Sequence, residues 1–167
     1  DCVKKFEGMF AFVVFDKKKN KIYMFRDQLG IKPIYYTKIG NSFYFASELK
    51  AFKKIVLLSL NSKKLVEYIT WGNIVGEETL FQGIKQIEPG HYIKINSKLK
   101  INKKKYFDLK NTFSKSSKVK SFSNLENQLK NDIISHTVSD VNYGTQLSGG
   151  LDSSLITAIV SLNKSQK

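Results

Sequence analysis

The chain has 167 residues, of which 41% are hydrophobic and 13% aromatic, so it has enough apolar material for a packed core and is not a disordered chain. Its formal net charge is +14, yet Arg26 is the only arginine among its 28 basic residues. Because proteins that read base edges usually rely on arginine, we expect no nucleic-acid partner.

Three lysine-rich stretches carry most of the positive charge: Lys17–Lys21, Lys98–Lys105 and Lys110–Lys120. They lie in predicted turns and a linker without interleaved aromatic residues, so we interpret them as solvated lysines. The longest apolar runs, Met9–Phe15 and Ile55–Leu58, are too short to span a bilayer, and we expect no membrane partner. A single cysteine excludes an internal disulfide and suits a reducing, cytoplasmic setting.

The first predicted element is a β-hairpin. Met9–Phe15 and Ile22–Phe25 are apolar and aromatic, and the polar turn 16–20 separates them. A second hairpin is predicted from Ile34–Tyr36 and Phe43–Phe45, which flank a turn at Gly40-Asn41.

Two helices are predicted next. Ser47 is the expected N-cap of a helix over Glu48–Lys54, and Ser62 begins a second helix over Lys63–Trp71 with Gly72 as its C-cap. We interpret Trp71 as a core residue, like most of the Phe and Tyr side chains.

The remaining pattern divides the chain into two domains. Pro89-Gly90 is a turn signal that leads into a strand at His91–Ile95. A Ser- and Lys-rich stretch follows, and we interpret it as a linker. The predicted organisation is a mainly β domain at 1–108, a linker at 109–122 and the start of a second domain at 123–167.

The second domain is predicted to open with a helix. Ser123 and Glu126 have the spacing of a capping box. The positions that keep helical spacing in this segment are Leu125, Leu129, Ile133, Thr137 and Val141. This helix leads to a short predicted strand at Tyr143–Leu147, in which Gln146 would be buried and would need a hydrogen-bond partner.

The run Leu147-Ser148-Gly149-Gly150-Leu151-Asp152-Ser153-Ser154 is the most informative motif. It lies between the predicted strand and a helix indicated by the apolar residues of 155–160. Glycines allow main-chain N–H groups to approach phosphate oxygens, and a helix N-terminus adds unpaired donors. A carboxylate here would repel phosphate unless it held Mg²⁺, so Asp152 indicates a magnesium-bound pyrophosphate.

Spacing excludes two better-known phosphate loops. The Walker loop requires Gly-Lys-Ser/Thr, and no lysine lies between Gly144 and Ser161. The dinucleotide fingerprint requires a third glycine where this chain has Ser153. The motif resembles instead the Ser-Gly-Gly-x-Asp-Ser loop of the PP-loop ATP pyrophosphatases; an ordinary Gly/Ser turn with a helix cap is the alternative.

Several further segments carry a wider resemblance. They are Gly8–Phe12, Arg26–Tyr36 (Arg-Asp-Gln-Leu-Gly-Ile-Lys-Pro-Ile-Tyr-Tyr), Phe45–Ala51, Glu88–Tyr92 and Ser139–Gly144. In this order, and with the loop at 148–154, they resemble the glutamine-dependent asparagine synthetases. Two residues depart from the pattern of that family: Asn142 stands where proline is usual, and Gln146 where an apolar residue is usual.

The resemblance implies the fold and the site. It implies an α/β chain, α+β in its N-terminal part: a partial αββα sandwich of the N-terminal nucleophile hydrolases, then the first β-loop-α of a Rossmann-like PP-loop domain. Leu147 would touch the nucleotide. The expected pyrophosphate ligands are Ser148, Gly149, Gly150 and Ser153, and Asp152 would hold Mg²⁺.

No residue of the chain is expected to be a glutaminase catalyst. That family uses an N-terminal cysteine, whereas Cys2 follows Asp1 and lacks a free amine. We interpret Arg26 and Asp27 as a structural ion pair that fixes the turn before Gly30, rather than a catalytic pair. His91 and His136 lack partners at metal spacing, so no zinc site is expected.

The leading hypothesis is an internal fragment of a glutamine-hydrolysing asparagine synthetase that uses ATP, Mg²⁺, aspartate and glutamine. As an isolated segment it is expected to be inactive, and a homodimer is compatible with the resemblance. Two alternatives remain open: a related enzyme that adenylates another carboxylate, as β-lactam synthetases do, and a non-enzymatic basic binding module.

Overall fold

A computed structural model describes residues 2–111 and 121–163 of the chain. The chain divides into two compact units, residues 1–112 and 113–167. Most of the expected linker, and the third lysine-rich stretch after Lys110, lie outside the described residues.

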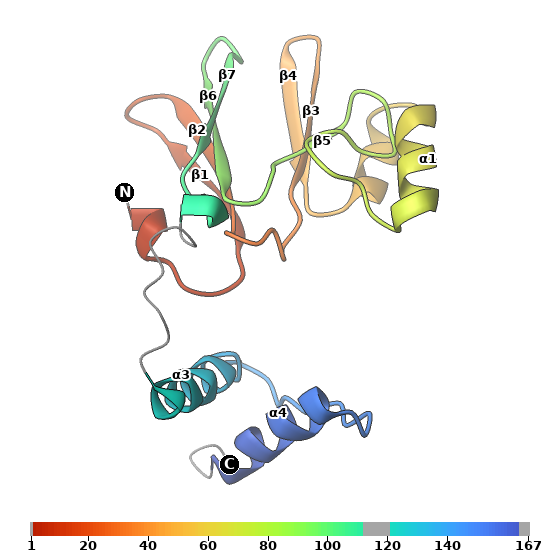
Figure 1. Ribbon diagram of the computed structural model, residues 1–167. Helices are drawn as coiled ribbons and strands as arrows, with labels where there is room; N and C mark the ends of the chain where they lie inside the picture. Colours follow the sequence, from red (N-terminus) through yellow and green to blue (C-terminus); the bar gives the residue numbers. More distant parts are fainter. Residues whose placement is uncertain (1, 112–120, 164–167) are drawn as a thin grey trace. The chain divides into compact units, whose positions relative to one another are not determined.

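The first unit contains two antiparallel sheets (Figure 1). The four-stranded sheet, in the order β1-β2-β6-β7, consists of β1 (Ala11–Asp16), β2 (Lys21–Arg26), β6 (His91–Asn96) and β7 (Ile101–Lys105). The three-stranded sheet, in the order β4-β3-β5, consists of β3 (Tyr35–Ile39), β4 (Ser42–Ala46) and β5 (Lys85–Gln86).

Both predicted hairpins are confirmed. β1 and β2 pair from Ala11 opposite Arg26 to Asp16 opposite Lys21. Their turn is stabilised by Asp16, whose carboxylate accepts a 3.0 Å hydrogen bond from the N–H of Lys19. In the second hairpin, β3 and β4 pair from Tyr35 opposite Ala46 to Ile39 opposite Ser42.

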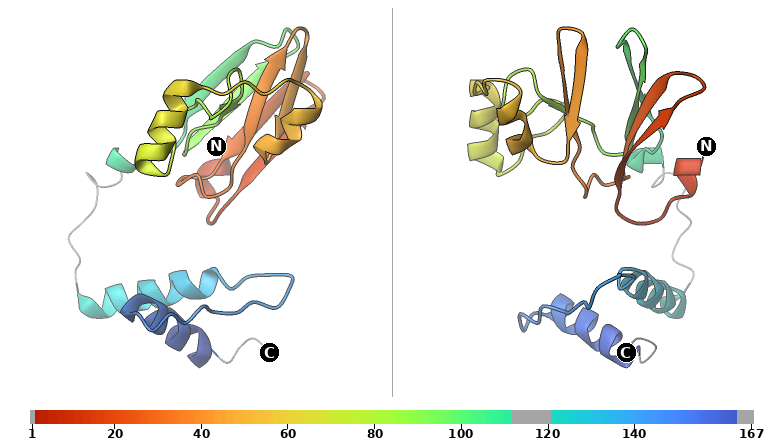
Figure 2. Two further views of the ribbon diagram at one scale, coloured as in Figure 1. Left: turned by 90° about the vertical axis from the view of Figure 1, so that its right-hand side faces the viewer. Right: turned by 180° about the vertical axis from the view of Figure 1, so that it is seen from behind.

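The core of the first unit lies between the two sheets. Its buried members are Met24, Ile34, Tyr36, Ile87, Ile93 and Ile95. Met24, Ile93 and Ile95 occupy alternate positions that face inward from the four-stranded sheet. Figure 2 shows the two sheets face to face, with α1 and η2 on the outer side of the three-stranded sheet.

The helices of this unit are η1 (Cys2–Lys5), η2 (Leu49–Lys54) and α1 (Ser62–Trp71). The prediction for Ser47 is wrong, because η2 is a 3-10 helix with Glu48 at its N-cap and no side-chain cap bond. The N-cap of α1 is Asn61, whose side chain accepts from the N–H of Lys64. Gly72 is confirmed as the C-cap, with φ +68°.

Two expectations about burial and strands are wrong in this unit. Trp71 is 78% exposed, since it lies at the last position of α1 and outside the buried core. The lysine-rich stretch Lys98–Lys105 contains a strand, β7, which pairs with β6 along its whole length. A strand at the edge of a sheet tolerates lysines because one side of its backbone faces solvent.

The second unit begins with α3 (Phe122–Ser135). The predicted capping box is wrong, since the N-cap is Ser121, whose hydroxyl accepts from the N–H of Asn124. Ser123 lies inside the helix, and Glu126 pairs with Lys130 at 2.6 Å instead. The helix ends at Ser135 and does not reach Val141.

The second helix of this unit, α4 (Leu151–Leu162), follows the glycine loop as predicted. The prediction of a strand at Tyr143–Leu147 is wrong, because this segment has no regular secondary structure. A strand requires a neighbouring strand for its hydrogen bonds, and the described part of this unit contains none. Gln146 is consequently exposed rather than buried.

No helix in the described parts of the chain has both the length and the apolar character needed to cross a membrane.

Candidate functional site

The glycine loop forms a tight turn into α4. Gly149 has φ +84°, a backbone conformation that residues with a side chain rarely adopt. A Cβ at this position would contact no other group within 4 Å. Backbone conformation, and not lack of space, therefore explains a glycine at this position. Gly150 is the N-cap of α4 and is in extended conformation.

Two serines join the two sides of the loop. The hydroxyl oxygens of Ser148 and Ser153 lie 2.9 Å apart, and Ser153 also donates to the carbonyl of Gly150 at 3.0 Å. These contacts hold the loop across the first turn of α4, so both hydroxyls lie beside the helix N-terminus. They are exposed or half-buried and accessible to a ligand.

The N-terminus of α4 presents main-chain donors to solvent. Gly150 provides no side-chain cap, so the first N–H groups of the helix keep their hydrogen-bonding capacity. Together with the positive end of the helix dipole, these donors form a surface that suits anionic oxygens.

Asp152 lies in the first turn of α4 and is exposed. Within residues 121–163 its carboxylate makes no hydrogen bond or ion pair, so it is free to bind a cation. Leu147 and Leu151 flank the loop and are 61% and 84% exposed. The structure thus brings together the six residues expected to bind nucleotide and metal, and their donor set fits a magnesium-bound phosphate.

A second polar centre lies in the first unit around Arg26, which is 9% exposed. Its guanidinium donates to four oxygens: the carbonyls of Lys32 (3.0 Å), Ile87 (2.6 Å) and Gly30 (2.7 Å), and Oε1 of Gln86 (3.1 Å). Because these acceptors come from two distant segments, Arg26 fastens the loop after β2 to the β5 region. Burial lowers the pKa of Arg26, against the opposing effect of Tyr35 and Asp27.

Asp27 organises the same loop from the other side. Its carboxylate, 1% exposed, accepts from the N–H groups of Phe10 (3.3 Å), Leu29 (3.1 Å), Ile31 (3.0 Å) and Lys32 (2.9 Å). Burial by itself raises the pKa of Asp27, but the main-chain donors outweigh it and hold the pKa below its ordinary value.

The prediction of an Arg26–Asp27 ion pair is therefore corrected. The two side chains make no ion pair with each other in the described structure, and each bonds mainly to backbone groups. The expectation that they fix the turn before Gly30 holds for both residues separately. Arg26 is the last residue of β2 and Asp27 the first residue of the loop after it, and the donors of one and the acceptors of the other are already engaged by different groups.

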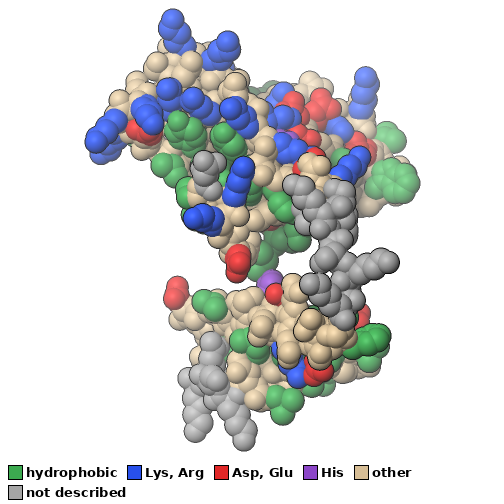
Figure 3. Space-filling model, turned by 60° about the vertical axis from the view of Figure 1, so that its left-hand side comes forward, with side chains coloured by type: hydrophobic (Ala, Val, Ile, Leu, Met, Phe, Trp, Pro, Cys, Tyr) green, Lys and Arg blue, Asp and Glu red, His purple; other side chains and the backbone are tan. Residues whose placement is uncertain are grey.

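Lysines of the first unit gather at one end of its sheets. Figure 3 shows basic side chains over the end at which Figure 1 places the β1–β2, β3–β4 and β6–β7 connections. The four residues of the β1–β2 connection, Lys17–Asn20, are all exposed.

Within residues 2–111 and 121–163, no three or more His, Cys, Asp or Glu side chains form a group that could hold a metal ion.

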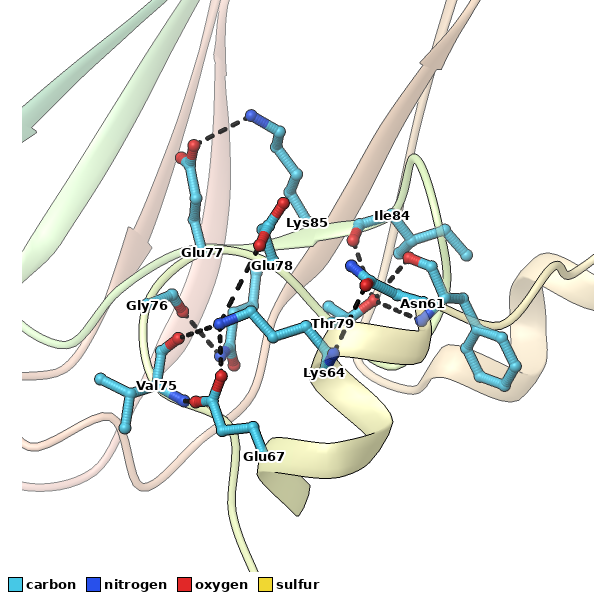
Figure 4. Close-up of polar contacts among 12 residues, drawn as sticks. Asn61, Lys64, Glu67, Val75, Gly76, Glu77, Glu78, Thr79, Ile84 and Lys85 are labelled. Atoms are coloured by element: carbon cyan, nitrogen blue, oxygen red, sulfur yellow. Dashed lines mark hydrogen bonds and ion pairs between the residues drawn. The ribbon is translucent and has the colours of Figure 1, made fainter. Parts of the chain in front are cut away.

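Sequence reasoning missed a clamp on the loop after α1. Nζ of Lys64 lies 2.6 Å from Oε2 of Glu67 and donates to the carbonyl of Val75 at 3.2 Å. Glu67 in turn accepts from the N–H of Val75 at 2.6 Å (Figure 4). The i, i+3 spacing of Lys64 and Glu67 was the available signal, but it does not reveal which loop the pair would hold.

Two family models match the chain, one in each unit. A glutamine amidotransferase domain matches residues 1–107, and an asparagine synthase domain matches residues 124–166. The chain belongs to the family of glutamine-hydrolysing asparagine synthetases. Its fold is that of a glutamine amidotransferase of the N-terminal nucleophile class, followed by a partial Rossmann-like part that here consists of the loop and α4.

Named relatives agree with this assignment. The chain is 38% identical to asparagine synthetase [glutamine-hydrolyzing] 3 of Bacillus subtilis, over 95% of this chain and 26% of the relative. It is 37% identical to a putative asparagine synthetase 2 of Methanocaldococcus jannaschii, over 96% of this chain and 32% of the relative. It is also 29% identical to amidase chry2 of Gibberella zeae, over 95% of this chain and 24% of the relative. The chain thus spans about a quarter to a third of the length of these relatives.

Proposed function

We propose that this chain is part of an enzyme that converts ATP, L-aspartate, L-glutamine and water to AMP, diphosphate, L-asparagine and L-glutamate. Aspartate is activated as its β-aspartyl adenylate, and ammonia from glutamine displaces AMP. The single observation that supports this most directly is the geometry of the loop at 148–153, which sits at the uncapped N-terminus of α4.

The residues of the loop have separate tasks in this proposal. The main-chain N–H groups at Gly149 and Gly150, with the hydroxyls of Ser148 and Ser153, bind the pyrophosphate oxygens. Asp152 holds Mg²⁺, which neutralises phosphate charge when it is bound. The exposed side chain of Leu147 contacts the nucleotide.

The first unit supplies a scaffold and no catalytic group in this proposal. The buried centre formed by Arg26 and Asp27 bonds to main-chain groups, which supports a structural task. Cys2 is exposed and free, and the proposal gives it no catalytic part. The single cysteine supports a cytoplasmic setting for the enzyme.

The test is an assay of the full-length protein with Mg²⁺-ATP and aspartate, with either glutamine or ammonia as nitrogen donor. AMP and asparagine should form in equal amounts and only when aspartate is present. Absence of aspartate-dependent AMP release with both nitrogen donors would defeat the proposal.

A second candidate is a related enzyme that adenylates a different carboxylate. The similarity to a protein named as an amidase supports it, because the same segment occurs in relatives that do not carry the asparagine synthetase name. Pyrophosphate release with a panel of other carboxylic acids, and none with aspartate, would favour this candidate over the first.

A further inference from the structure

A cavity of about 320 Å³ opens at one edge of the two-sheet sandwich. Its walls include Tyr36 and Lys38 of β3, Lys85 of β5 and Lys103 of β7. β7 and β5 are the last strands of their respective sheets, which places the cavity at the open edge between the sheets. We call it the edge pocket. It belongs to neither the nucleotide loop nor the Arg26 centre.

The phenol of Tyr36 is the unusual group in the edge pocket. Tyr36 is 5% exposed, and its ring stacks on that of Phe43. Its O–H makes no hydrogen bond with another described residue, and it is not one of the fully buried polar atoms, so this oxygen is accessible from the cavity. The same cavity is lined by the charged side chains of Glu77, Lys85 and Lys103.

The phenol remains a donor throughout the physiological pH range. Burial, reinforced by the charge of Glu77, raises the pKa of Tyr36 to about 12. The phenol can therefore donate a hydrogen bond to an acceptor atom of a ligand in the cavity.

The charges around the cavity leave one positive charge in excess. Glu77 pairs with Lys85 at 2.9 Å and with Lys103 at 3.4 Å, and Lys103 also pairs with Glu88. These two lysines and two glutamates balance one another; Figure 4 shows the Glu77–Lys85 pair. Lys38 makes no ion pair among the described residues and adds the unbalanced charge.

We propose that the edge pocket binds a small monovalent carboxylate, which accepts a hydrogen bond from Tyr36 and pairs with Lys38. A carboxylate has two acceptor oxygens for these two donors and a single negative charge for the single excess lysine. The volume lies at the lower end of the range for small-molecule sites, which suits a ligand of a few heavy atoms. The inference does not depend on the proposed reaction.

The test is acetate binding to full-length protein labelled with ¹⁵N-tyrosine, followed through the amide resonance of Tyr36. Acetate should shift this resonance saturably, while the neutral isostere acetamide leaves it unchanged. Tyr36→Phe and Lys38→Met should each weaken acetate binding about five- to tenfold. Tyr36→Phe removes a hydroxyl without a partner, so its melting temperature should match that of the parent protein.

Two matched variants serve as controls. Lys104 is next to Lys103 in β7 and its side chain points to the opposite face, so Lys104→Met removes a lysine that does not face the edge pocket. Tyr44→Phe removes a tyrosine hydroxyl from the adjacent strand, β4. Both should bind acetate like the parent protein. The proposal is overturned if acetate gives no saturable shift, if Tyr36→Phe and Lys38→Met bind normally, or if phosphate binds as tightly as acetate.

Discussion

Gly30 and Pro89 are in such close contact that a Cβ added to Gly30 would lie 2.7 Å from Cγ of Pro89. The same two segments are joined by the N–H of Gly90, which donates to the carbonyl of Asp27 at 2.8 Å. The loop after β2 and the turn before β6 therefore pack directly against each other, although they are about sixty residues apart in sequence.

We predict that Gly30→Ala destabilises the first unit by about 3 kcal/mol, because it combines a positive φ of +70° with this steric overlap. Gly72→Ala is the matched control, since Gly72 has φ +68° and open space around it. It should cost only about 1 kcal/mol. Urea unfolding of both variants measures the difference, and equal losses would show that the contact with Pro89 is unimportant.

Asp27→Asn should lower the free energy of unfolding by about 2 to 4 kcal/mol. An amide cannot accept from all four N–H groups that the carboxylate serves, and buried donors without acceptors are costly. Asp16→Asn is the control, because Asp16 accepts from a single exposed turn N–H. A stability loss at Asp27 no larger than that at Asp16 would contradict this account.

The pH dependence of stability should change in the same variant. The pKa of Asp27 is lower in the folded chain than its ordinary value of 3.8. Its ionised form therefore stabilises the fold above pH 3.8, and this contribution is lost as the pH falls through the lowered pKa. Unfolding free energies between pH 6 and pH 2 should fall less steeply in Asp27→Asn than in the parent protein.

Ser121→Ala should destabilise α3 by about 1 kcal/mol, because its hydroxyl caps the N–H of Asn124. Ser123→Ala should have a much smaller effect, since the hydroxyl of Ser123 contacts the hydroxyl of Ser121 at 2.9 Å and does not itself cap the N–H of Asn124. Hydrogen exchange of the first-turn amides of α3 in the two variants measures this. A larger loss of protection in Ser123→Ala than in Ser121→Ala would support the capping box that the sequence predicted, with Ser123 as the N-cap.

Asp152→Ala should weaken Mg²⁺-dependent ATP binding by the full-length protein at least tenfold, on the order of the loss seen when a metal site is impaired. Asp140→Ala, an exposed carboxylate outside the loop, is the control and should leave binding unchanged. Isothermal titration with and without Mg²⁺ separates a metal effect from a fold effect. Unaltered magnesium dependence in Asp152→Ala would show that this carboxylate does not hold the ion.

Gly149→Ala tests the loop backbone in the same assay. A methyl group meets no neighbour there, but the φ of +84° is strained for alanine. The loop should therefore move to a different conformation, and ATP affinity should fall while α4 remains helical by circular dichroism. Normal ATP affinity would mean that the left-handed conformation is not needed for binding.

Local patterns determined the hairpins, α1 with its C-cap Gly72, and the loop–helix junction at Gly150. In each case the signal lies within a few residues: a polar turn between apolar strands, or glycines followed by a helical apolar run. The order of the short motifs along the chain was also sufficient to indicate the family, because each motif is a short contiguous run of residues that can be recognised in the sequence alone.

Tertiary structure decided what depended on partners distant in sequence. β7 forms because β6 offers a free edge, whereas Tyr143–Leu147 stays irregular because no described strand pairs with it. Likewise, Arg26 and Asp27 bond to backbone groups that only the folded loop brings within reach. Tyr36 of β3 comes close to the charges of Glu77 and of Lys103 in β7 only in the folded unit. Hydrogen bonds and charges act over a few ångströms of space, and sequence spacing does not encode these distances.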